Sequence, residues 1–594
     1  MRSILFALLL ASASAPFAQP ANTIDDTRLD ALAALARTYG VVRYFHPSDS
    51  LDQVSWDRFL VHACDRMGSV SDPAQIAPRL EELFGPVVEG FRVGAPGGAI
   101  EAAKGEGALV EWRHLGYGLE AGSDRSAPLY VSWRTHHDPL HNRKANGGYF
   151  QNLARAQASV NDQPVMRLRL TPDLEAQIAV SLPMSATKVG APQQARLDQL
   201  AKTLEASSGA GDAVSRAQAH ADGIALWNVA RHFYPYWAVV KIDWEGVLRK
   251  WLAAQPQRQS RAQHVESLRR LAAPMGDGQA SIHDPRDTAA KQFLPVSLRP
   301  AGDQWVVDES RIARVRIGDV LVAVDGKPMA QWYADRAALE SGSEQHKRWR
   351  VRDELLRGAK DALVKLRFMR GGQPIEAVLA YESPTPIGAA RPPAIHELKP
   401  GIYYVDVRRF SKAGFDSSLP ALRDARGIVF DLRGYPSGDA AALASYWITG
   451  TDGAQWMRIP RFDKPFAEPT SGWTLGWQRE RDAALEKPAK VLLTDGRAIS
   501  FAESLAGYFP GQKTGLIVGE STAGANGNTA SATLPGGMKF TFTGMVVTRH
   551  DGAIYHGEGF KPDITVIPTP AGIQAGRDEV LERAVATLEN AAPR

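Results

Sequence analysis

The sequence contains little of three things: cysteine, net charge and long apolar stretches. Only one of its 594 residues is a cysteine, Cys64, so no disulfide forms within the chain, and we expect this thiol to be a small buried hydrophobe. The formal net charge is +4 and no block of Lys or Arg stands out, which argues against a nucleic-acid partner. After residues 1–18 no apolar run is long enough for a transmembrane helix. The fold must therefore rest on packed cores, and this length predicts three or four domains.

The first residues, MRSILFALLLASASAPFA, have the three parts of a secretory targeting segment. Arg2 supplies a positive charge, residues 4–10 are apolar, and small residues lead to a cleavage site after Ala18. The apolar run is too short to span a bilayer. We therefore expect a signal peptide at residues 1–18 and an exported protein, periplasmic or extracellular.

Two helical units follow, at residues 19–87 and 221–291. RYFHP at 43–47 recurs as RHFYP at 231–235, and WD at 56–57 recurs as WE at 244–245. Both pairs are 188 positions apart, which indicates a duplicated helical unit in which proline ends the first helix. The aromatic landmarks, with His46 and Tyr234, fit a ligand site or packing between helices, and packing is favoured.

Residues 88–185 are rich in strand formers separated by Gly, Pro and Asp, and predict a small β-sandwich. A loop there carries Trp133, His136, His137 and His141, next to Asp138. A metal site and a polar surface loop both fit this loop, and the surface loop is favoured. Residues 186–220, rich in Ala, Gln and Ser, predict a helical linker.

Residues 292–382 predict a second β-rich unit. IGDVLVAVDGKPM, at 317–329, predicts a strand, a tight Asp-Gly turn and a proline exit. A hairpin turning at Gly371-Gly372 closes the unit, and a helical insertion at 331–358 separates the two parts.

The last part of the chain, residues 383–594, alternates strand and helix patterns, which predicts parallel crossover units. Within it VLLTDGRAISFAE, at 491–503, predicts a strand, a turn and the start of a helix. Ser500 takes the N-cap position with Glu503 three residues on, the pattern of a capping box. A serine at such a junction is a cap or a nucleophile, because free N–H groups at a helix start stabilise a developing oxyanion.

Several motifs of this region occur in one order: VFDLRGYPSG (429–438), LLTDGRAISFAES (492–504), VGESTAGANGN (518–528), LPGG (534–537) and GEGFKPD (557–563). With GDVLVAVDGKP at 318–328, they make the chain resemble the tail-specific protease superfamily. This superfamily includes the carboxy-terminal processing peptidases, the tricorn core protease and the retinoid-binding protein repeats. The resemblance covers roughly residues 220–590 and leaves the β-rich residues 88–185 without a counterpart.

The resemblance implies an α/β multidomain fold. Its expected parts are N-terminal helical units, a β-rich domain, an α/β (crotonase-like) protease core at 383–594 and a PDZ-like domain inserted at 292–382. PDZ-like domains capture extended chain ends at a sheet edge.

By the same resemblance Ser500 matches the family nucleophile, and the backbone N–H groups of Phe501 and Gly438 fall where the oxyanion hole is built. The processing peptidases use a lysine base, but its position holds Ala525. The tricorn-like branch uses Ser, His and Glu, and Glu558 matches its glutamate.

The position of the family histidine holds Gln279, which cannot act as a general base. His283 lies on the same face of the expected strand and is the substitute candidate. It would reach Ser500 only if the strand were shifted, bulged or bent back. His550 and His556 are more distant alternatives.

The sequence therefore predicts an exported serine endopeptidase that forms an acyl-enzyme on Ser500, with a polypeptide substrate and no metal or cofactor. The alternative is a catalytically silent or weakened relative that binds peptides or another ligand. Ser500 and Glu558 favour the first function, and Gln279 favours the second.

Overall fold

The computed structural model describes residues 25–119, 129–136, 163–206 and 213–590. The predicted signal peptide and the histidines at 137 and 141 lie outside these ranges. In the part of the chain that the structure describes, no helix combines the length and the apolar character that a membrane crossing requires.

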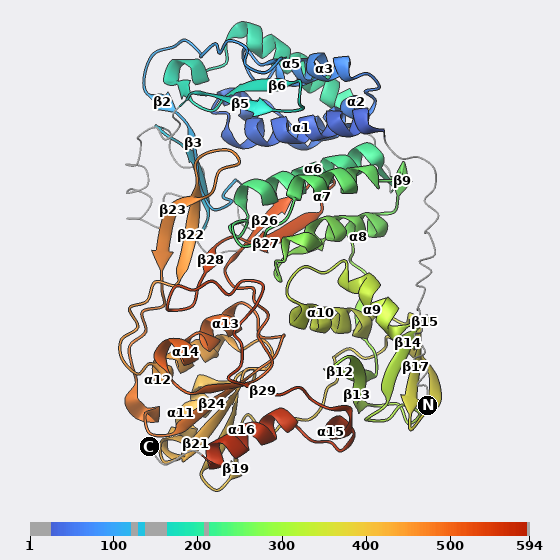
Figure 1. Ribbon diagram of the computed structural model, residues 1–594, viewed down its shortest axis with the longest axis vertical. Coiled ribbons are helices and arrows are strands. Elements are labelled where there is room, and N and C mark those ends of the chain that lie inside the picture. The colour runs from blue at the N-terminus through green and yellow to red at the C-terminus, as the bar shows by residue number, and fades with distance from the viewer. Residues whose placement is uncertain (1–24, 120–128, 137–162, 207–212, 591–594) are drawn as a thin grey trace, which may run out of the picture.

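Helices of the two predicted copies stack at one end of the molecule (Figure 1). The first copy has α1 (Asp26–Phe45), α2 (Trp56–Gly68) and α3 (Ile76–Phe84), and the second has α6 (Arg216–Phe233), α7 (Trp244–Ala253) and α8 (Arg261–Ala272). The predicted linker between them contains α5 (Ala191–Ala206). One hydrophobic cluster joins both copies, and Cys64 is buried in it.

The first helix ends in the same way in both copies. The C-cap residues His46 and Tyr234 are 188 positions apart, and their backbone angles are φ −77°, ψ 121° and φ −76°, ψ 121°. The rings of Tyr44 and Phe233 lie edge to face at 5.2 Å between the copies. Packing between helices, rather than a ligand site, accounts for these aromatic residues.

The strands of residues 88–185 do not form a separate sandwich. They are β1 (Arg92–Gly94), β2 (Leu109–Val110), β3 (Trp112–Leu115), β4 (Val131–Arg134), β5 (Val165–Arg169), β6 (Glu175–Ala179) and β7 (Leu182–Pro183). Strands β1, β6 and β5 form one small sheet and β2 pairs with β7. Strands β3 and β4 instead extend a sheet of order β23-β22-β3-β4, made with β22 (Met457–Phe462) and β23 (Thr470–Leu475).

The reason for this correction is the burial of β3. All four of its residues are buried, so it lacks the alternation of a strand with one face in water. Its Arg113 is 1% exposed and lies 2.8 Å from Glu111 and 3.6 Å from Asp463, which follows β22. The ion pair with Asp463 ties the N-terminal strands to the C-terminal region.

Residues 292–382 fold around one antiparallel sheet of order β12-β13-β14-β17-β18, with β15 at its side. Its elements are β11 (Lys291–Phe293), β12 (Val296–Ala301), β13 (Gln304–Ser310), β14 (Val320–Val324), β15 (Lys327–Pro328), α9 (Met329–Ala337), α10 (Glu344–Leu356), β16 (Arg357–Ala359), β17 (Leu363–Arg370) and β18 (Gln373–Ala380). The predicted turns are confirmed: Asp325 and Gly326 have φ 47° and 81°, and Gly371 and Gly372 have φ 53° and 81°. The predicted helical insertion corresponds to α9 and α10.

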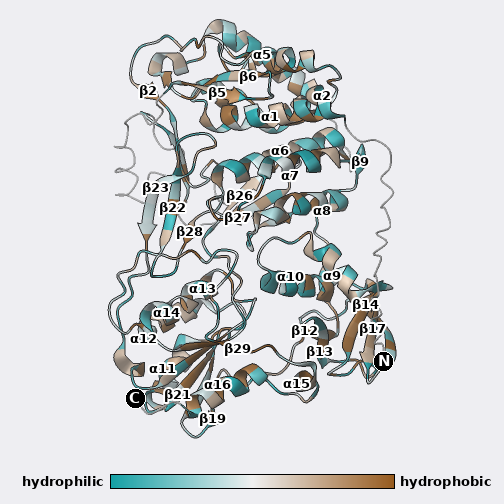
Figure 2. Cartoon of the chain, viewed as in Figure 1, coloured by the Kyte–Doolittle hydropathy of each residue, from teal (hydrophilic) through white to brown (hydrophobic). Residues whose placement is uncertain are grey.

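A six-stranded sheet forms the opposite end of the molecule (Figure 1). Its order is β19 (Ile395–Lys399), β20 (Ile402–Asp406), β21 (Gly427–Asp431), β24 (Ala489–Thr494), β25 (Leu516–Gly519) and β29 (Ile564–Thr565). From β20 to β29 neighbouring strands are parallel, as the alternating pattern predicted. The sheet is hydrophobic on both faces, and Figure 2 shows apolar colouring along its strands.

Helices cover both faces of this sheet. Val491 and Leu493 of β24 pack with α16 (Glu579–Glu589), while Leu492 faces the opposite cluster. That second cluster draws on α11 (Lys412–Arg423), α12 (Leu443–Trp447), α13 (Phe501–Ala506) and α14 (Tyr508–Gln512). The remaining elements are β8 (Val214–Ser215), β9 (Arg258–Gln259), β10 (Ser281–His283), β26 (Thr529–Thr533), β27 (Lys539–Thr543), β28 (Val546–Val547) and α15 (Pro570–Gln574).

Candidate active site

Ser500 lies at a sharp turn between β24 and α13. Its backbone has φ 58° and ψ −117°, a left-handed conformation that favours glycine. The N–H of Ser500 donates to the carbonyl of Ala525 at 2.9 Å, and its carbonyl accepts from the N–H of Glu503 at 2.8 Å. These bonds hold a costly conformation, and such strain concentrates at functional sites.

The predicted capping box is wrong. The hydroxyl of Ser500 does not cap α13, and within the described ranges it makes no hydrogen bond. The carboxylate of Glu503 is engaged elsewhere, so Ser500 keeps a hydroxyl that is available for chemistry.

Glu503 fastens the glycine-rich loop to the start of α13. It is fully buried and accepts from the backbone N–H groups of Gly524 at 2.8 Å and Ala525 at 2.9 Å, and from the hydroxyl of Thr522. Burial raises the pKa of Glu503 to about 7, and these hydrogen bonds oppose the rise. Because Ala525 in turn accepts the N–H of Ser500, the glutamate supports the backbone of the serine through one intermediate residue.

A cavity of about 540 Å³ opens beside Ser500. Its described wall consists of Gln279, Tyr435, Met457, Trp477, Ile499, Ser500, Phe501, Ser504, Asn526, Gly527, Asn528 and Thr529. The wall thus combines an apolar side with a side of hydroxyls and amides. It contains no Asp, Glu, Lys, Arg or His among the described residues.

Gln279 is held in the cavity wall by a short polar network. Both the N–H and the hydroxyl of Thr543 lie 2.7 Å from the carboxylate of buried Asp277, and the same hydroxyl lies 2.6 Å from Oε1 of Gln279. The backbone N–H of Gln279 donates to Asp277 at 3.0 Å. The amide is therefore fixed next to Ser500, in the place where the resemblance implies a histidine.

The structure does not bring His283 to this wall. His283 is exposed at the end of β10, where it pairs with Lys539, and the register of β10 against β27 is regular. Gln279 contacts Thr543, four residues along β27 from Lys539, and four strand residues span about 13 Å. The shift or bend that His283 would need is not present in β10.

Glu558 has its backbone at the site and its side chain in solvent. A Cβ added to Gly524 would lie 2.8 Å from the N of Glu558, so the two loops are in close contact. Its carboxylate pairs with Lys561 at 2.9 Å, and the side chain is 64% exposed. The hydrogen bond from Lys561 holds the pKa of Glu558 below its usual value.

The two predicted oxyanion donors stand at helix starts. Phe501 begins α13 and lines the cavity. Gly438 begins a short 3₁₀ turn, Gly438–Ala442, and space is open where its Cβ would be. The first N–H groups of a helix have no acceptor within it, so both positions can donate.

The other two histidines lie behind the wall. His556 is buried, stacks on Tyr236 at 3.7 Å between ring centroids, and has Nε2 at 2.6 Å from the hydroxyl of Tyr234. Burial lowers the pKa of His556 to about 4. His550 is half-buried and stacks on Trp456, and neither histidine lines the cavity.

The sequence did not indicate that the start of α10 contacts the two loops beside Ser500. Ser343 donates to the carbonyl of Ala523 at 2.7 Å, and Gln345 Nε2 donates to the carbonyls of Thr522 and Glu558 at 2.9 and 2.8 Å. The start of α10 thus contacts both loops of the site. The helical insertion was predicted, but nothing in its pattern showed which residues face Ser500.

Comparisons with known proteins agree with this architecture. Residues 401–566 match the model of peptidase family S41, and this range includes the Ser500 turn and the glycine-rich loop. A search of curated proteins returned no match.

Solved structures with a similar fold were also found. Mature CPAF, solved with lactacystin, has a TM-score of 0.50 and 13% identity, and the match covers 63% of this chain and 98% of that one. A serine-to-alanine mutant of CPAF has a TM-score of 0.51, 13% identity and coverage of 64% and 98%. The photosystem II D1 C-terminal processing protease has a TM-score of 0.36 and 19% identity, with coverage of 59% and 92%.

Proposed function

We propose that this chain is a serine peptidase of family S41, whose model matches residues 401–566, and that Ser500 is its nucleophile. The observation that carries the proposal is the unengaged hydroxyl of Ser500, presented to a cavity from a strained turn at the start of α13. A strained strand-to-helix turn exposes a serine hydroxyl in other hydrolases as well.

The proposed reaction is acyl transfer. The Ser500 oxygen attacks the carbonyl carbon of a peptide bond, its proton passes to a base, and the amine leaves with a proton as the acyl-enzyme forms. The N–H groups of Phe501 and Gly438 stabilise the oxyanion. Water then attacks the ester and releases the acid, which restores the serine.

Gln279 favours a second candidate function. A serine hydroxyl is a poor nucleophile without a base, and the described cavity wall offers no carboxylate, amine or imidazole. We therefore propose slow turnover relative to family members with a complete triad. In the limit of no turnover, the protein binds peptides in the same cavity.

Labelling with a fluorophosphonate tests the proposal. Wild type should be labelled on Ser500, and Ser500→Ala should not be labelled. Ser504→Ala is the matched control, because Ser504 lines the same cavity but accepts a hydrogen bond from Asn526 at 3.0 Å. Equal labelling of wild type and Ser500→Ala would contradict the nucleophile, and an unlabelled wild type that still binds peptide would favour the second function.

We also propose that residues 292–382 form a PDZ-like domain that guides polypeptide substrates. The support is the antiparallel sheet with the Asp325-Gly326 turn, since such sheets bind extended chains at an edge. Deleting the domain should slow cleavage of a long unfolded chain more than that of a short peptide. Equal loss on both substrates would indicate a structural role.

Export is the third part of the proposal, and it rests on the pattern of residues 1–18. N-terminal sequencing of the mature protein should find a start near Gln19. An intact Met1 in the cytoplasmic fraction would show that the segment is not a signal peptide.

A further inference from the structure

We propose that the cavity beside Ser500 is a specificity pocket for a large uncharged side chain, preferably aromatic, and that Trp477 selects it. The side chain is that of the residue whose carbonyl Ser500 attacks. This inference rests on the proposed function and adds a substrate class that the family match does not supply.

The absence of charge in the wall excludes charged side chains. None of the described residues that line the cavity carries a carboxylate, an ammonium, a guanidinium or an imidazole. A Lys or Glu side chain that entered would lose hydration without gaining an ionic partner, which costs far more than burial of an apolar group. Charge therefore decides which substrate side chains can enter the pocket, and shape selects among the uncharged ones.

One side of the cavity is apolar and mostly aromatic. Phe501 is at its centre, with ring centroids 5.7 Å from Trp477 and 6.4 Å from Tyr435. Met457 and Ile499 complete this side. Aromatic rings pair favourably at such separations, and the Met457 thioether adapts to a ring edge, so an aromatic substrate side chain has partners on several sides.

The other side presents neutral hydrogen-bonding groups, those of Gln279, Asn526, Asn528 and Thr529. The Nδ2 of Asn526 already donates to Ser504 and to the hydroxyl of Tyr555, at 3.0 and 2.9 Å, so its amide is fixed. A volume of about 540 Å³ leaves room for a ring and the adjoining backbone. This side therefore accommodates a phenol as well as a phenyl ring.

Trp477 is held from behind by residues outside the cavity. It follows β23 and precedes Gln478, which has φ 51°, so the chain turns sharply just after it. Its ring lies 5.6 Å from that of Trp456 and 5.8 Å from that of Tyr508, and the Arg479 guanidinium lies 5.7 Å from it. A side chain supported in this way can serve as a rigid wall.

Strand β22, which carries Met457, pairs with β3 through Arg461 opposite Leu115 and Phe462 opposite His114. Strand β23, which leads to Trp477, pairs with β22. The N-terminal strands thus support the wall of the pocket. Since the sequence resemblance does not extend to residues 88–185, this support is a property of the present chain.

Peptidyl diphenyl phosphonates test the pocket, because they label an active serine without requiring turnover. The probes differ only in the side chain next to phosphorus: Phe, Leu, Ala, Lys or Glu. Wild type should react with the Phe probe at least about 100 times faster than with the Lys or Glu probe. Trp477→Ala should slow the Phe probe about tenfold or more and the Ala probe less than twofold.

Two variants control for folding. Trp477→Phe should restore most of the rate with the Phe probe. Trp473→Ala changes a tryptophan of β23, the strand that leads to Trp477, and this tryptophan does not line the cavity; the variant should leave the ratio between the Phe and Ala probes unchanged. A fall in that ratio in Trp473→Ala as large as in Trp477→Ala would assign the effect to the hairpin as a whole and overturn the role of Trp477.

The outcomes separate this inference from the proposed function. If neither a fluorophosphonate nor any peptidyl probe labels Ser500, the nucleophile is wrong and the pocket inference falls with it. If Ser500 is labelled but the rates are equal across the five probes, or highest for Lys or Glu, the nucleophile stands and the specificity pocket is overturned.

Discussion

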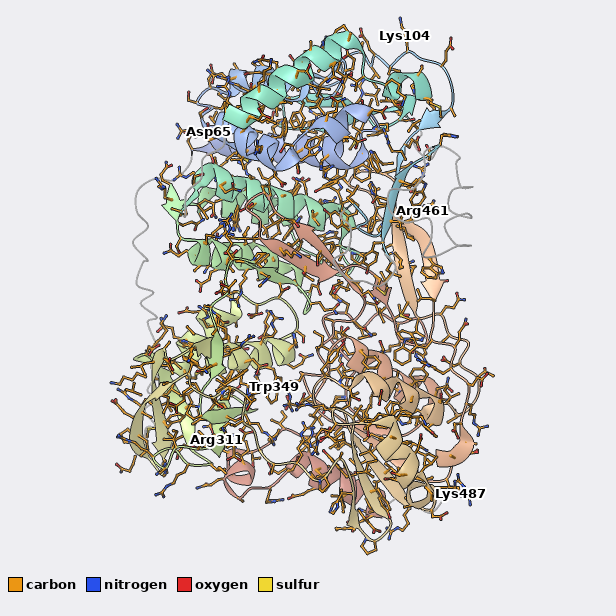
Figure 3. All side chains as sticks on the ribbon, turned by 180° about the vertical axis from the view of Figure 1, so that it is seen from behind. Asp65, Lys104, Arg311, Trp349, Arg461 and Lys487 are labelled. Atoms are coloured by element: carbon orange, nitrogen blue, oxygen red, sulfur yellow. The ribbon has the colours of Figure 1, made fainter. Side chains whose placement is uncertain are left out.

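The imidazole Nδ1 of His346 lies 2.9 Å from the carbonyl oxygen of Gly496, on the loop that leads to Ser500. A carbonyl accepts, so Nδ1 carries the proton, and the buried Nε2 has no hydrogen-bond partner among the described residues. One turn further along α10, the ring of Trp349 lies 4.1 Å from the guanidinium of Arg497, and Figure 3 shows Trp349 between the two units. Helix α10 of the β12–β18 unit therefore holds the loop that leads to Ser500.

Removing the His346 contact should slow the chemistry at Ser500. His346→Phe keeps a ring of similar size but loses the hydrogen bond to Gly496, so we expect fluorophosphonate labelling to be about three- to tenfold slower and stability to fall by about 1 kcal/mol. Glu344→Ala changes an exposed residue of the same helix and should do neither. Identical labelling rates for wild type and His346→Phe would show that α10 does not position the loop.

Protonation of His346 gives the same contact a pH dependence. Burial lowers the pKa of His346, so the folded protein keeps it neutral. The stability that this contributes is present above the ordinary pKa of about 6.5 and is lost as the pH falls below it. Wild type should therefore lose more stability on acidification than His346→Phe, as measured by urea unfolding at several pH values.

The positive φ of Ser500 predicts that glycine at this position removes activity but leaves a more stable protein than alanine does. Both Ser500→Gly and Ser500→Ala remove the Ser500 hydroxyl. Glycine tolerates φ 58° and alanine does not, so Ser500→Gly should be about 1 kcal/mol more stable than Ser500→Ala. Urea unfolding measures the difference, and a more stable alanine variant would show that the turn is not strained.

Restoring a base at residue 279 should raise activity. Gln279 lines the cavity next to Ser500, so Gln279→His should increase peptide cleavage and make the rate rise through a pKa of about 6 to 7. His283→Ala should change the rate less than threefold, because His283 ends β10 opposite Lys539 and away from the wall. A loss of about a hundredfold in His283→Ala would reinstate His283 as the base.

Glu503 should make stability fall as the pH rises. Its pKa of about 7 exceeds the ordinary value of 4.5, so its contribution is complete below pH 4.5 and is lost as the pH rises through 7. Glu503→Gln loses the acceptor for the Ala525 N–H, which should cost about 1–3 kcal/mol at pH 5.

At pH 8 the difference in the free energy of unfolding between wild type and Glu503→Gln should be smaller, because wild type then carries a buried charge that the variant lacks. Urea unfolding at both pH values measures it. Glu558→Gln, which changes an exposed carboxylate, serves as the control. A gap that stays constant from pH 5 to pH 8 would contradict the assigned titration.

Features set by neighbouring residues were predictable from the sequence. The Asp325-Gly326 and Gly371-Gly372 turns and the parallel strands carry local signals, and all are found. The Ser500 turn was placed correctly, but the capping box was not, because the loop at 522–525 takes the Glu503 carboxylate. That loop is distant in sequence and leaves no mark on the Ser-x-x-Glu pattern.

Contacts between distant segments were not predictable. The pairing of β3 with β22 and the bond from His346 to Gly496 each join residues more than a hundred positions apart, and no periodicity within either segment reports the other. The cavity wall is of this kind as well. Its aromatic side comes from Tyr435, Trp477 and Phe501, three separate segments whose approach depends on the whole fold.

The bond between the Thr543 N–H and Asp277 joins residues 266 positions apart, and it fixes the order in which this protein can be built. Strand β10 pairs with β27 and β3 pairs with β22, and both partners lie in the second half of the chain. The half that is synthesised first therefore carries unpaired strand edges until the second half has been made. Such edges are where a growing or translocating chain aggregates. The segment 401–566 that matches the family model contains neither β10 nor β3, so a fragment cut to those limits would leave β27 and β22 without these partner strands.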